Sequence, residues 1–165
     1  METAKSTGTA DRPNPLDALR ARLEELDISG ARLINGALNT DAERLILSAI
    51  MDNLTDHIYF KDLRSRFVMV NRSLADRFGL KTPGEAVGKT DFDFFSEEHA
   101  KAAFDDEQDI IQTGRPIMNK EEKETWPDKP VSWVSSTKMP WLGPDGERIG
   151  TFGISRDITE RKLAE

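Results

Sequence analysis

The spacing of hydrophobic residues divides the chain into segments of different character. Residues 1–14 are mostly small and polar, with little apolar surface to bury, and they predict a disordered tail. Residues 15–55 carry apolar residues at helical spacing and predict a helical segment for dimerisation or linkage. From residue 56 the pattern becomes strand-like. We therefore expect one domain over residues 56–160, with residues 161–165 starting an exit helix.

The first helix is predicted from four leucines that follow 3-4-3 spacing, which places them on one stripe: Leu16, Leu19, Leu23 and Leu26. The stripe weakens at Gly30 and is too short for a strict coiled coil. A break from Gly36 to Asn39 separates it from a second helix that begins at Thr40. The leucines could be buried in a dimer or by folding back on the outer face of the sheet, and both alternatives remain open.

The domain itself is predicted to begin with two strands, because short apolar runs flank a polar turn. A long helix follows, beginning after Ser96 and ending at Gly114, where glycine suits a left-handed C-terminal position. Three strands complete the domain. Two strands, helices over their apolar face and three antiparallel strands form an α+β half-barrel. The five expected strands lie near residues 58–60, 67–70, 117–126, 131–141 and 149–156.

Composition narrows the function classes. The chain has 165 residues and a net charge of −7, so direct binding of nucleic acid would work against its charge. No apolar run approaches the ~20 residues of a membrane-spanning helix, and the start lacks the apolar region of a secretory signal. The expected location is therefore the cytoplasm. The absence of cysteine excludes disulfides, thiolate metal sites and cysteine nucleophiles.

Four stretches, in this order, resemble the PAS sensory domain in the S-box form common in bacterial signalling proteins. They are Asp56–Asn71, Val87–Phe95 with its Gly-Lys-Thr-Asp start, Thr137–Pro140, and the closing Gly153–Lys162 with its Arg-Asp-Ile-Thr-Glu-Arg-Lys run. The resemblance covers about residues 45–163. It implies a five-stranded antiparallel sheet of order 2-1-5-4-3, helices on one face, and a ligand pocket between them. It also implies a homodimer that serves as the input module of a histidine kinase, a cyclase or a transcription regulator.

The closing stretch has a physical interpretation of its own. Asp157 ends the last predicted strand and can cap a following helix, with Thr159 in its first turn and Glu160 reaching back to the cap. A short capped junction is stiff, so a shift of the sheet would be passed to the helix. We expect these three residues to relay a signal to an effector that lies outside this chain.

The interior of the domain holds the candidate ligand-binding residues, since some side chains on the strands and the long helix must face the pocket. The alternative is that they only fill the core, and this leaves open an adaptor that acts without a ligand. The cofactor is unknown: none, a noncovalent flavin, a haem or a small metabolite, but no cysteinyl-flavin adduct. The candidates are Phe60, Met69, Asn71, Phe104, Trp133, Thr137 and Phe152, with Ile154 beside them.

Histidines and carboxylates give little support for catalysis. His57 and His99 are the only histidines, and we expect both at the surface rather than as haem ligands. The acidic residues over 105–109 point around a helix and are expected to form a solvated face, so no metal site is predicted. There is no Gly-x-Ser-x-Gly elbow and no phosphate-binding loop. We assign no catalytic residues and expect no enzyme activity in this chain.

Overall fold

The computed structural model describes residues 33–34, 37–38 and 40–165, which belong to two compact units, residues 1–48 and 49–165. In the first unit, β1 (Leu33–Ile34) pairs antiparallel with β2 (Ala37–Leu38). Helix α2 (Thr40–Asn53) begins in the first unit and ends in the second. No helix in the described part of the chain is long and apolar enough to cross a membrane.

The strands β1 and β2 correct the prediction of a helical segment over residues 15–55. The second predicted helix agrees with α2, which begins at Thr40. The four leucines of the predicted dimerisation helix lie outside the described residues.

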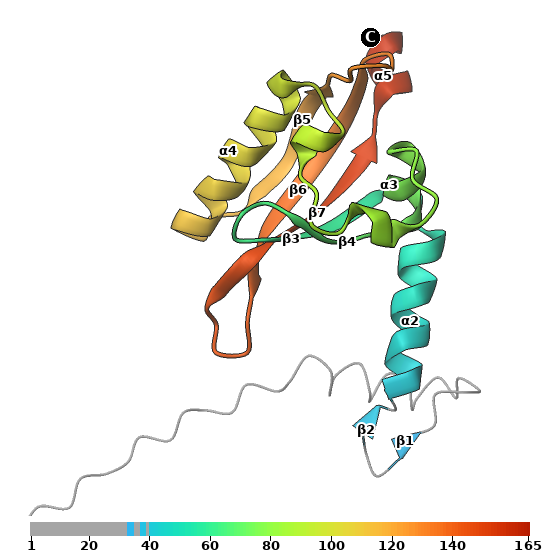
Figure 1. The fold of residues 1–165 in the computed structure, drawn as a ribbon, viewed down its shortest axis with the longest axis vertical. Coiled ribbons are helices and arrows are strands. Elements are labelled where there is room, and N and C mark those ends of the chain that lie inside the picture. Colours follow the sequence, from blue (N-terminus) through green and yellow to red (C-terminus); the bar gives the residue numbers. More distant parts are fainter. Residues whose placement is uncertain (1–32, 35–36, 39) are drawn as a thin grey trace, which may run out of the picture. The chain divides into compact units, whose positions relative to one another are not determined.

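The second unit is built on one five-stranded antiparallel sheet (Figure 1). Its strand order is β4-β3-β7-β6-β5, which is the predicted order 2-1-5-4-3 counted within the domain. The α+β class and this topology are therefore confirmed. The strands are β3 (His57–Asp62), β4 (Phe67–Val70), β5 (Ile117–Glu124), β6 (Ser132–Leu142) and β7 (Arg148–Asp157).

Helices connect the two halves of the sheet. The longest, α4, lies against β5, β6 and β7, as Figure 1 shows. It ends at Gly114, whose φ of 72° is left-handed and whose N–H donates to the Ile110 carbonyl oxygen at 2.7 Å. The chain leaves the sheet as α5. The elements are α3 (Arg72–Arg77), the 3₁₀ helices η1 (Pro83–Ala86) and η2 (Asp91–Asp93), α4 (Glu97–Thr113) and α5 (Thr159–Ala164).

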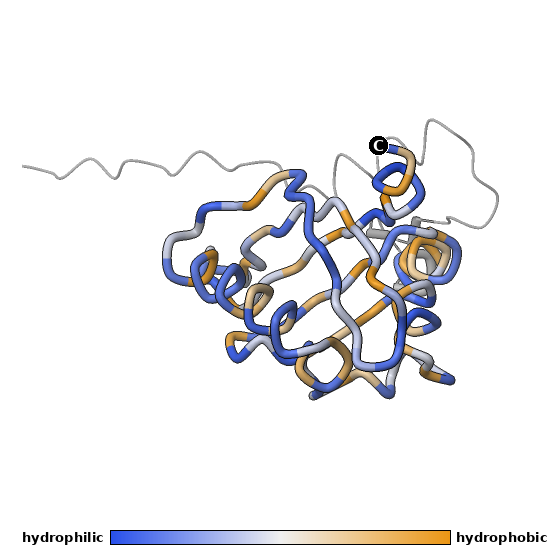
Figure 2. Tube along the Cα trace, turned by 90° about the horizontal axis from the view of Figure 1, so that it is seen from above, coloured by the Kyte–Doolittle hydropathy of each residue, from blue (hydrophilic) through white to orange (hydrophobic). Residues whose placement is uncertain are grey.

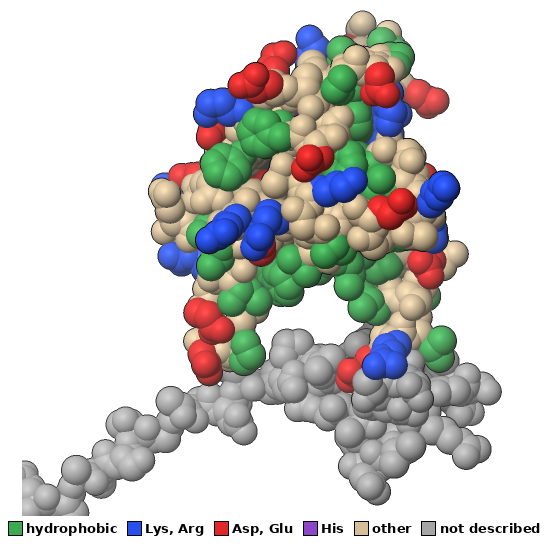
Figure 3. Space-filling view, in the orientation of Figure 1, with side chains coloured by type: hydrophobic (Ala, Val, Ile, Leu, Met, Phe, Trp, Pro, Cys, Tyr) green, Lys and Arg blue, Asp and Glu red, His purple; other side chains and the backbone are tan. Residues whose placement is uncertain are grey.

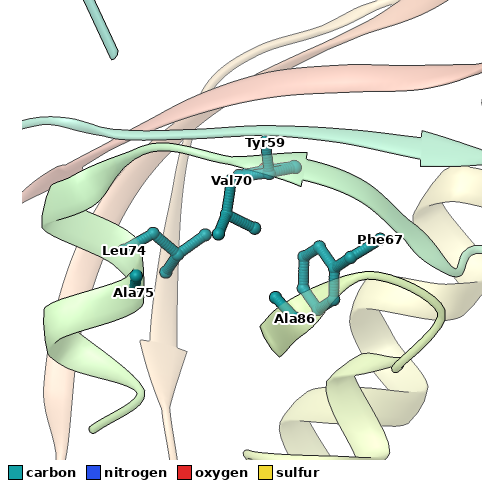
Figure 4. Packing of buried hydrophobic residues seen from close by; sticks show 6 residues of the cluster. All are labelled: Tyr59, Phe67, Val70, Leu74, Ala75 and Ala86. Carbon is teal, nitrogen blue, oxygen red and sulfur yellow. The ribbon is translucent and has the colours of Figure 1, made fainter. Parts of the chain in front are cut away.

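Hydrophobic packing is concentrated at one end of the sheet, under α3 and η1. Figure 4 shows this cluster, which comprises Tyr59, Phe67, Val70, Leu74, Ala75 and Ala86. A second cluster joins Phe95 and Trp126, whose ring centroids lie 4.3 Å apart, and Phe78 packs against both clusters. Hydrophilic residues occur within the strands as well as in the connections (Figure 2). Apolar packing therefore accounts for only part of the interior.

Asn71 joins the first two strands to α3. Its side chain is fully buried, and its Oδ1 accepts from the N–H groups of Ile58 and Leu74, each at 3.1 Å. Its Nδ2 donates to the carbonyl oxygens of Asp56 at 2.7 Å and Leu54 at 3.4 Å. The side-chain amide thus serves as the N-cap of α3 and holds the chain before β3.

Candidate ligand site

A small cavity lies between the sheet and α4. Its volume is about 30 Å³, more than the ~10–15 Å³ that a single water molecule requires. Charged and polar side chains face it from the strands, and aromatic side chains form much of the rest. Its lining is His57, Tyr59, Lys61, Phe67, Leu74, Phe78, Asp91, Phe95, His99, Ala103, Glu107, Glu122, Glu124, Val134, Lys138 and Ser155.

Strand alternation brings the charged residues to the cavity. On β3 the inward positions are His57, Tyr59 and Lys61, and on β5 they are Glu122 and Glu124. The sheet face that carries the cavity is therefore rich in ionisable groups. Its middle is crossed by a chain of hydroxyl groups on three neighbouring strands.

That chain begins at Tyr59, whose Oη lies 3.4 Å from Ser155 Oγ, and Ser155 Oγ lies 2.7 Å from Ser136 Oγ. Gly153 makes this arrangement possible, since a Cβ there would lie 2.6 Å from Tyr59 Oη. The glycine of the closing sequence stretch thus leaves room for the tyrosine ring. We conclude that its absence of a side chain shapes the cavity wall.

Lys61 is the centre of the first ion cluster. Its Nζ lies 2.5 Å from Asp91 Oδ2 and 2.8 Å from both carboxylate oxygens of Glu107. Burial by itself would lower the pKa of Lys61, but the carboxylates of Asp91 and Glu107 outweigh it and raise that pKa above its ordinary value. Burial raises the pKa of Glu107 to about 7, against the opposing effect of Lys61. The cluster ties β3 to η2 and α4.

Lys138 is the centre of the second cluster, on β6. Its Nζ lies 2.9 Å from Glu122 Oε1 and 3.2 Å from Asp106 Oδ2. Lys120 also reaches Asp106, at 2.7 Å. Burial would lower the pKa of Lys138, but Tyr59 and Glu122 raise it above its usual range. This cluster joins α4 to the other side of the sheet.

Glu124 differs from the other buried carboxylates because it has no ion-pair partner among the described residues. Its Oε1 accepts from Ser132 Oγ at 2.8 Å, and Trp126 Nε1 donates to the same hydroxyl at 2.9 Å. The side chain of Glu124 is only 5% exposed. Burial therefore raises the pKa of Glu124 to about 7, while Ser132 and Arg77 act in the opposite direction.

Both histidines line the cavity, so the prediction that they lie at the surface is wrong. His57 and His99 are each 8% exposed. His99 begins the buried side of α4, and its Nδ1 lies 3.2 Å from the Lys123 carbonyl oxygen. Burial lowers the pKa of both imidazoles. The prediction relied on the position of His99 in the first turn of a capped helix and of His57 at the start of a strand. Neither position indicates that the side chain is exposed.

The seven predicted ligand-binding residues do not line the cavity. Phe60 and Phe152 stack on the opposite face of the sheet with centroids 5.3 Å apart, and Trp141 meets Phe60 edge-on. Met69 is 39% and Phe104 is 38% exposed. The prediction chose residues, both apolar and polar, that alternate on the strands or lie on the long helix, and expected some of them to face the cavity. In this sheet the alternate positions face the cavity, and a shift by one residue reverses the two faces.

The remaining candidates have partners elsewhere. The Thr137 hydroxyl accepts from the Asn119 N–H at 3.2 Å, and the Trp133 ring packs under Lys162. Asn71 caps α3, as described above. On the outer face of the sheet, Val68 and Ile154 are exposed hydrophobic residues. Figure 3 shows hydrophobic side chains gathered along the lower side of the second unit.

The junction between β7 and α5 is held by backbone and side-chain contacts. Asp157 Oδ1 accepts from the Thr159 N–H at 2.8 Å, and Thr159 Oγ1 accepts from the Trp133 N–H at 3.0 Å. Glu160 is exposed and makes no hydrogen bond to this junction within the described part of the chain. Arg161 and Lys162 instead contact Glu121 of β5, with Lys162 Nζ 2.5 Å from the carboxylate.

The raised pKa of Glu124 predicts an unusual pH dependence of stability. In the folded protein the carboxyl group keeps its proton up to about pH 7, whereas the ordinary pKa is 4.5. The folded state thus binds more protons, and stability falls as pH rises through this window. The lowered pKa values of His57 and His99 have the opposite effect, because they make stability rise with pH. That effect is confined to pH values below the ordinary histidine pKa of 6.5.

Between pH 6.5 and pH 8, the free energy of unfolding should therefore fall by about 1 kcal/mol less in Glu124→Gln than in the unsubstituted chain. Urea unfolding at the two pH values measures this difference. The groups around Glu124 that set its titration, Arg77, Glu122 and Asp157, stay unchanged. Glu98→Gln, on the exposed side of α4, is the matched control. An equal pH dependence of Glu124→Gln and the unsubstituted chain would contradict the assignment.

Comparison with known proteins agrees with the architecture. The methanogenesis regulatory histidine kinase FilI of Methanothrix harundinacea is 30% identical over 115 residues, 70% of this chain but 13% of the kinase. The VqmA–ligand–DNA complex from Vibrio cholerae shares 26% identity and a TM-score of 0.62 over 69% of this chain and 50% of VqmA. A PAS domain from Colwellia psychrerythraea gives 19% identity and a TM-score of 0.60, over 72% of this chain and 99% of that domain.

A family model described as the PAS fold matches residues 51–163, and this range contains the whole five-stranded sheet, the cavity and nearly all of α5. The match covers more than half of the chain, and the sheet has the expected strand order. The chain therefore belongs to the PAS domain family.

Proposed function

We propose that this chain is a sensory input domain that binds a small ligand in the cavity and relays its state to an effector. The observation that carries the proposal is the buried charge around the cavity. Lys61, Glu107 and Lys138 are each at most 3% exposed. Apolar residues of similar volume would make a core at least as stable as buried ion pairs do. Ionisable groups that line a cavity although they do not make the fold more stable than apolar residues would support a binding role.

Strand β5 supports a route from the cavity to the exit helix. Glu122 and Glu124 face the cavity, whereas Glu121 faces outward and pairs with Arg161 and Lys162 of α5. A ligand that displaced β5 would therefore also displace the anchor of α5. The Asp157 and Thr159 contacts hold the start of that helix on the sheet.

Asp157→Ala is expected to weaken this relay while the domain stays folded. Loss of the hydrogen bond to the Thr159 N–H should lower the free energy of unfolding by about 1 kcal/mol. Fusion of a histidine kinase domain after residue 165 would give a measurable output, and autophosphorylation should respond less to ligand. Glu160→Ala is the matched control, because Glu160 is exposed. Equal responses from the two variants would exclude Asp157 from the relay.

The proposed effector is a histidine kinase, as the FilI relative suggests, or a transcription regulator, as VqmA suggests. This chain spans 13% of FilI and about half of VqmA, so the effector would belong to a separate region or partner. We propose no enzyme activity and no direct contact with nucleic acid for the chain itself, and we place it in the cytoplasm. We also propose that the chain forms a homodimer through the leucine stripe of its N-terminal segment, Leu16, Leu19, Leu23 and Leu26.

A second candidate function is an adaptor that acts by assembly without a ligand. The observation that favours it is the cavity volume of about 30 Å³, which is small for a metabolite. An adaptor would keep its partners when the cavity is filled. A sensor would lose its response.

Filling the cavity separates the two functions. Ala103 lines it and is 5% exposed, so Ala103→Leu should occupy the free space. Ala102→Leu, on the exposed side of the same helix, is the control. We expect mass spectrometry of natively purified chain to detect a released small molecule that Ala103→Leu lacks. If no compound is released and the kinase fusion of Ala103→Leu behaves like that of Ala102→Leu, the adaptor is correct.

A further inference from the structure

Tyr59, Gly153 and Lys138 form one row across the middle of the sheet, on the face that carries the cavity. Gly153 of β7 is the Cα partner of Tyr59 on β3 and of Lys138 on β6. Its missing side chain leaves the space that the Tyr59 ring occupies, since an added Cβ would lie 2.6 Å from Oη and 2.7 Å from Cζ. The ring therefore extends over β7 toward the strand of Lys138, and both side chains line the cavity.

The two side chains act on each other's charge. Burial raises the pKa of Tyr59 above its ordinary value, and Lys138 is the strongest of the groups that oppose this rise. Tyr59 is in turn the strongest of the groups that raise the pKa of Lys138 against the effect of burial. At neutral pH the phenol thus keeps its proton and the amine is an ammonium group, so both are hydrogen-bond donors.

The hydroxyl chain that includes Tyr59 has one donor to spare. Tyr59 Oη lies 3.4 Å from Ser155 Oγ, which lies 2.7 Å from Ser136 Oγ, so three O–H groups share two hydrogen bonds. One O–H is therefore left without an acceptor among the described residues. Ser136 is fully buried and does not line the cavity, whereas Tyr59 and Ser155 do. Since a buried donor without a partner is costly, we expect the spare O–H to belong to the Tyr59–Ser155 pair and to point into the cavity.

Lys138 also has a donor to spare. Its ammonium group carries three N–H bonds and donates to Glu122 Oε1 at 2.9 Å and to Asp106 Oδ2 at 3.2 Å. Within the described part of the chain, no third acceptor lies at hydrogen-bond distance. The unused donors at this part of the wall are therefore an N–H of Lys138 and an O–H of the Tyr59–Ser155 pair.

The charges of the lining balance. Its two ammonium groups each have an ionised partner in the lining, whereas the other two carboxyl groups keep their protons up to about pH 7, because burial raises their pKa. Burial also lowers the pKa of both histidines and so favours the neutral imidazoles. The ammonium groups are those of Lys61 and Lys138, their partners are Asp91 and Glu122, and the protonated groups are those of Glu107 and Glu124.

Arg77 lies beside the lining and does not change this balance. Burial is the main influence on the pKa of His57 and of Glu124. Arg77 lowers both pKa values, and Asp157 raises both. The buried Nε of Arg77 has no partner among the described residues, but Arg77 does not line the cavity. The cavity thus offers free donors in a wall without net charge, and this suits a neutral acceptor.

We propose that the cavity binds a compact neutral carbonyl compound, whose oxygen accepts hydrogen bonds from Lys138 and from the Tyr59–Ser155 pair. The inference rests on the proposed sensory function and names its ligand class. The cavity of about 30 Å³ exceeds the ~10–15 Å³ that one water molecule requires, so a molecule of about three heavy atoms fits. A carbonyl oxygen has two lone pairs and can accept from both donors at once. Water is the alternative that the experiment must exclude.

Ligand-observed NMR of the full chain with formamide, formate and formamidinium tests the proposal. Formamide is neutral and has a carbonyl oxygen, formate is an anion of the same size, and formamidinium is a cation without an acceptor. Saturation transfer should detect bound formamide, with a Kd about tenfold or more below those of the two ions. The ¹⁵Nζ resonance of Lys138 should shift with formamide alone. Equal or tighter binding of either ion would overturn the proposal. So would the absence of formamide binding, because water would then suffice for the free donors.

The double variant Tyr59→Phe with Ser155→Ala locates the site, because it removes both hydroxyl groups that can donate to the carbonyl oxygen. It should weaken formamide binding about tenfold or more. Ser135→Ala, on the opposite face of β6, is the matched control and should leave binding unchanged. Circular dichroism checks the folding of each variant, and the Lys138 resonance gives a readout that needs no substitution. Formamide binding that survives the double variant would overturn the assignment of the site.

The outcomes also separate this inference from the proposed function. If formamide does not bind but a compound without a carbonyl group is released and is lost in Ala103→Leu, the ligand class is wrong and the sensory function stands. If no compound binds and Ala103→Leu leaves the output of the kinase fusion unchanged, both fail.

Discussion

Lys61→Met is expected to lower the free energy of unfolding by about 3–5 kcal/mol, measured by urea denaturation at pH 8. Lys61 is 2% exposed, and its ammonium group is the partner of Asp91 and Glu107. Without it, two carboxylates remain buried with no ion-pair partner among the described residues. The expected loss is a large share of the stability of an ordinary domain.

The loss should shrink as the pH falls from 8 to 5, because burial raises the pKa of Glu107 and its protonation removes part of the uncompensated charge. Lys101→Met provides the control, since Lys101 pairs with Asp105 at an exposed position on α4. That surface pair should contribute less than about 1 kcal/mol. A cost for Lys61→Met no greater than that of Lys101→Met would show that the ion cluster does not support the fold.

Gly150→Ala is expected to cost about 3 kcal/mol, the upper part of the usual range for overpacking. A Cβ on Gly150 would overlap the Lys61 carbonyl oxygen and would lie 3.0 Å from its carbon and 3.2 Å from Asp62 Cα. All three atoms belong to the backbone of β3, so no side-chain rotation can relieve the overlap. The pairing of β7 with β3 must shift instead.

The control for this substitution is Gly84→Ala in η1, where the nearest atom to an added Cβ is Thr82 Oγ1 at 3.9 Å. That change should alter stability by less than about 0.5 kcal/mol. Thermal unfolding of the two variants gives the comparison. A transition temperature for Gly150→Ala equal to that of Gly84→Ala would mean that the strands separate more easily than their geometry indicates.

The fold could be predicted from the sequence because its signals are local. Gly114 ends α4, a turn signal precedes β7, and the closing stretch ends the last strand and begins the exit helix α5 as expected. The confirmed strand order came from the family resemblance, because pairing between distant strands leaves no pattern in one sequence. The hairpin of β1 and β2 was missed because the helical spacing of neighbouring residues dominated the interpretation.

The cavity could not be predicted, because alternation defines two faces of a strand without telling which one is covered. The usual assumption assigns the apolar face to the interior. On β3 this choice selects Phe60, whereas the structure buries Lys61. Only the opposite charges of Asp91 and Glu107, 30 and 46 residues further along the chain, make that burial tolerable. Such a pairing is visible only once the fold has brought the three residues together.

Helix α4 carries two adjacent carboxylates with partners on different strands. Asp106 contacts Lys138 of β6 and Glu107 contacts Lys61 of β3, two strands that flank β7. A rotation of the helix about its axis would stretch both contacts together, because neighbouring residues turn as one body. A movement of α4 would therefore act on β3 and β6 at once, although these two strands do not pair with each other.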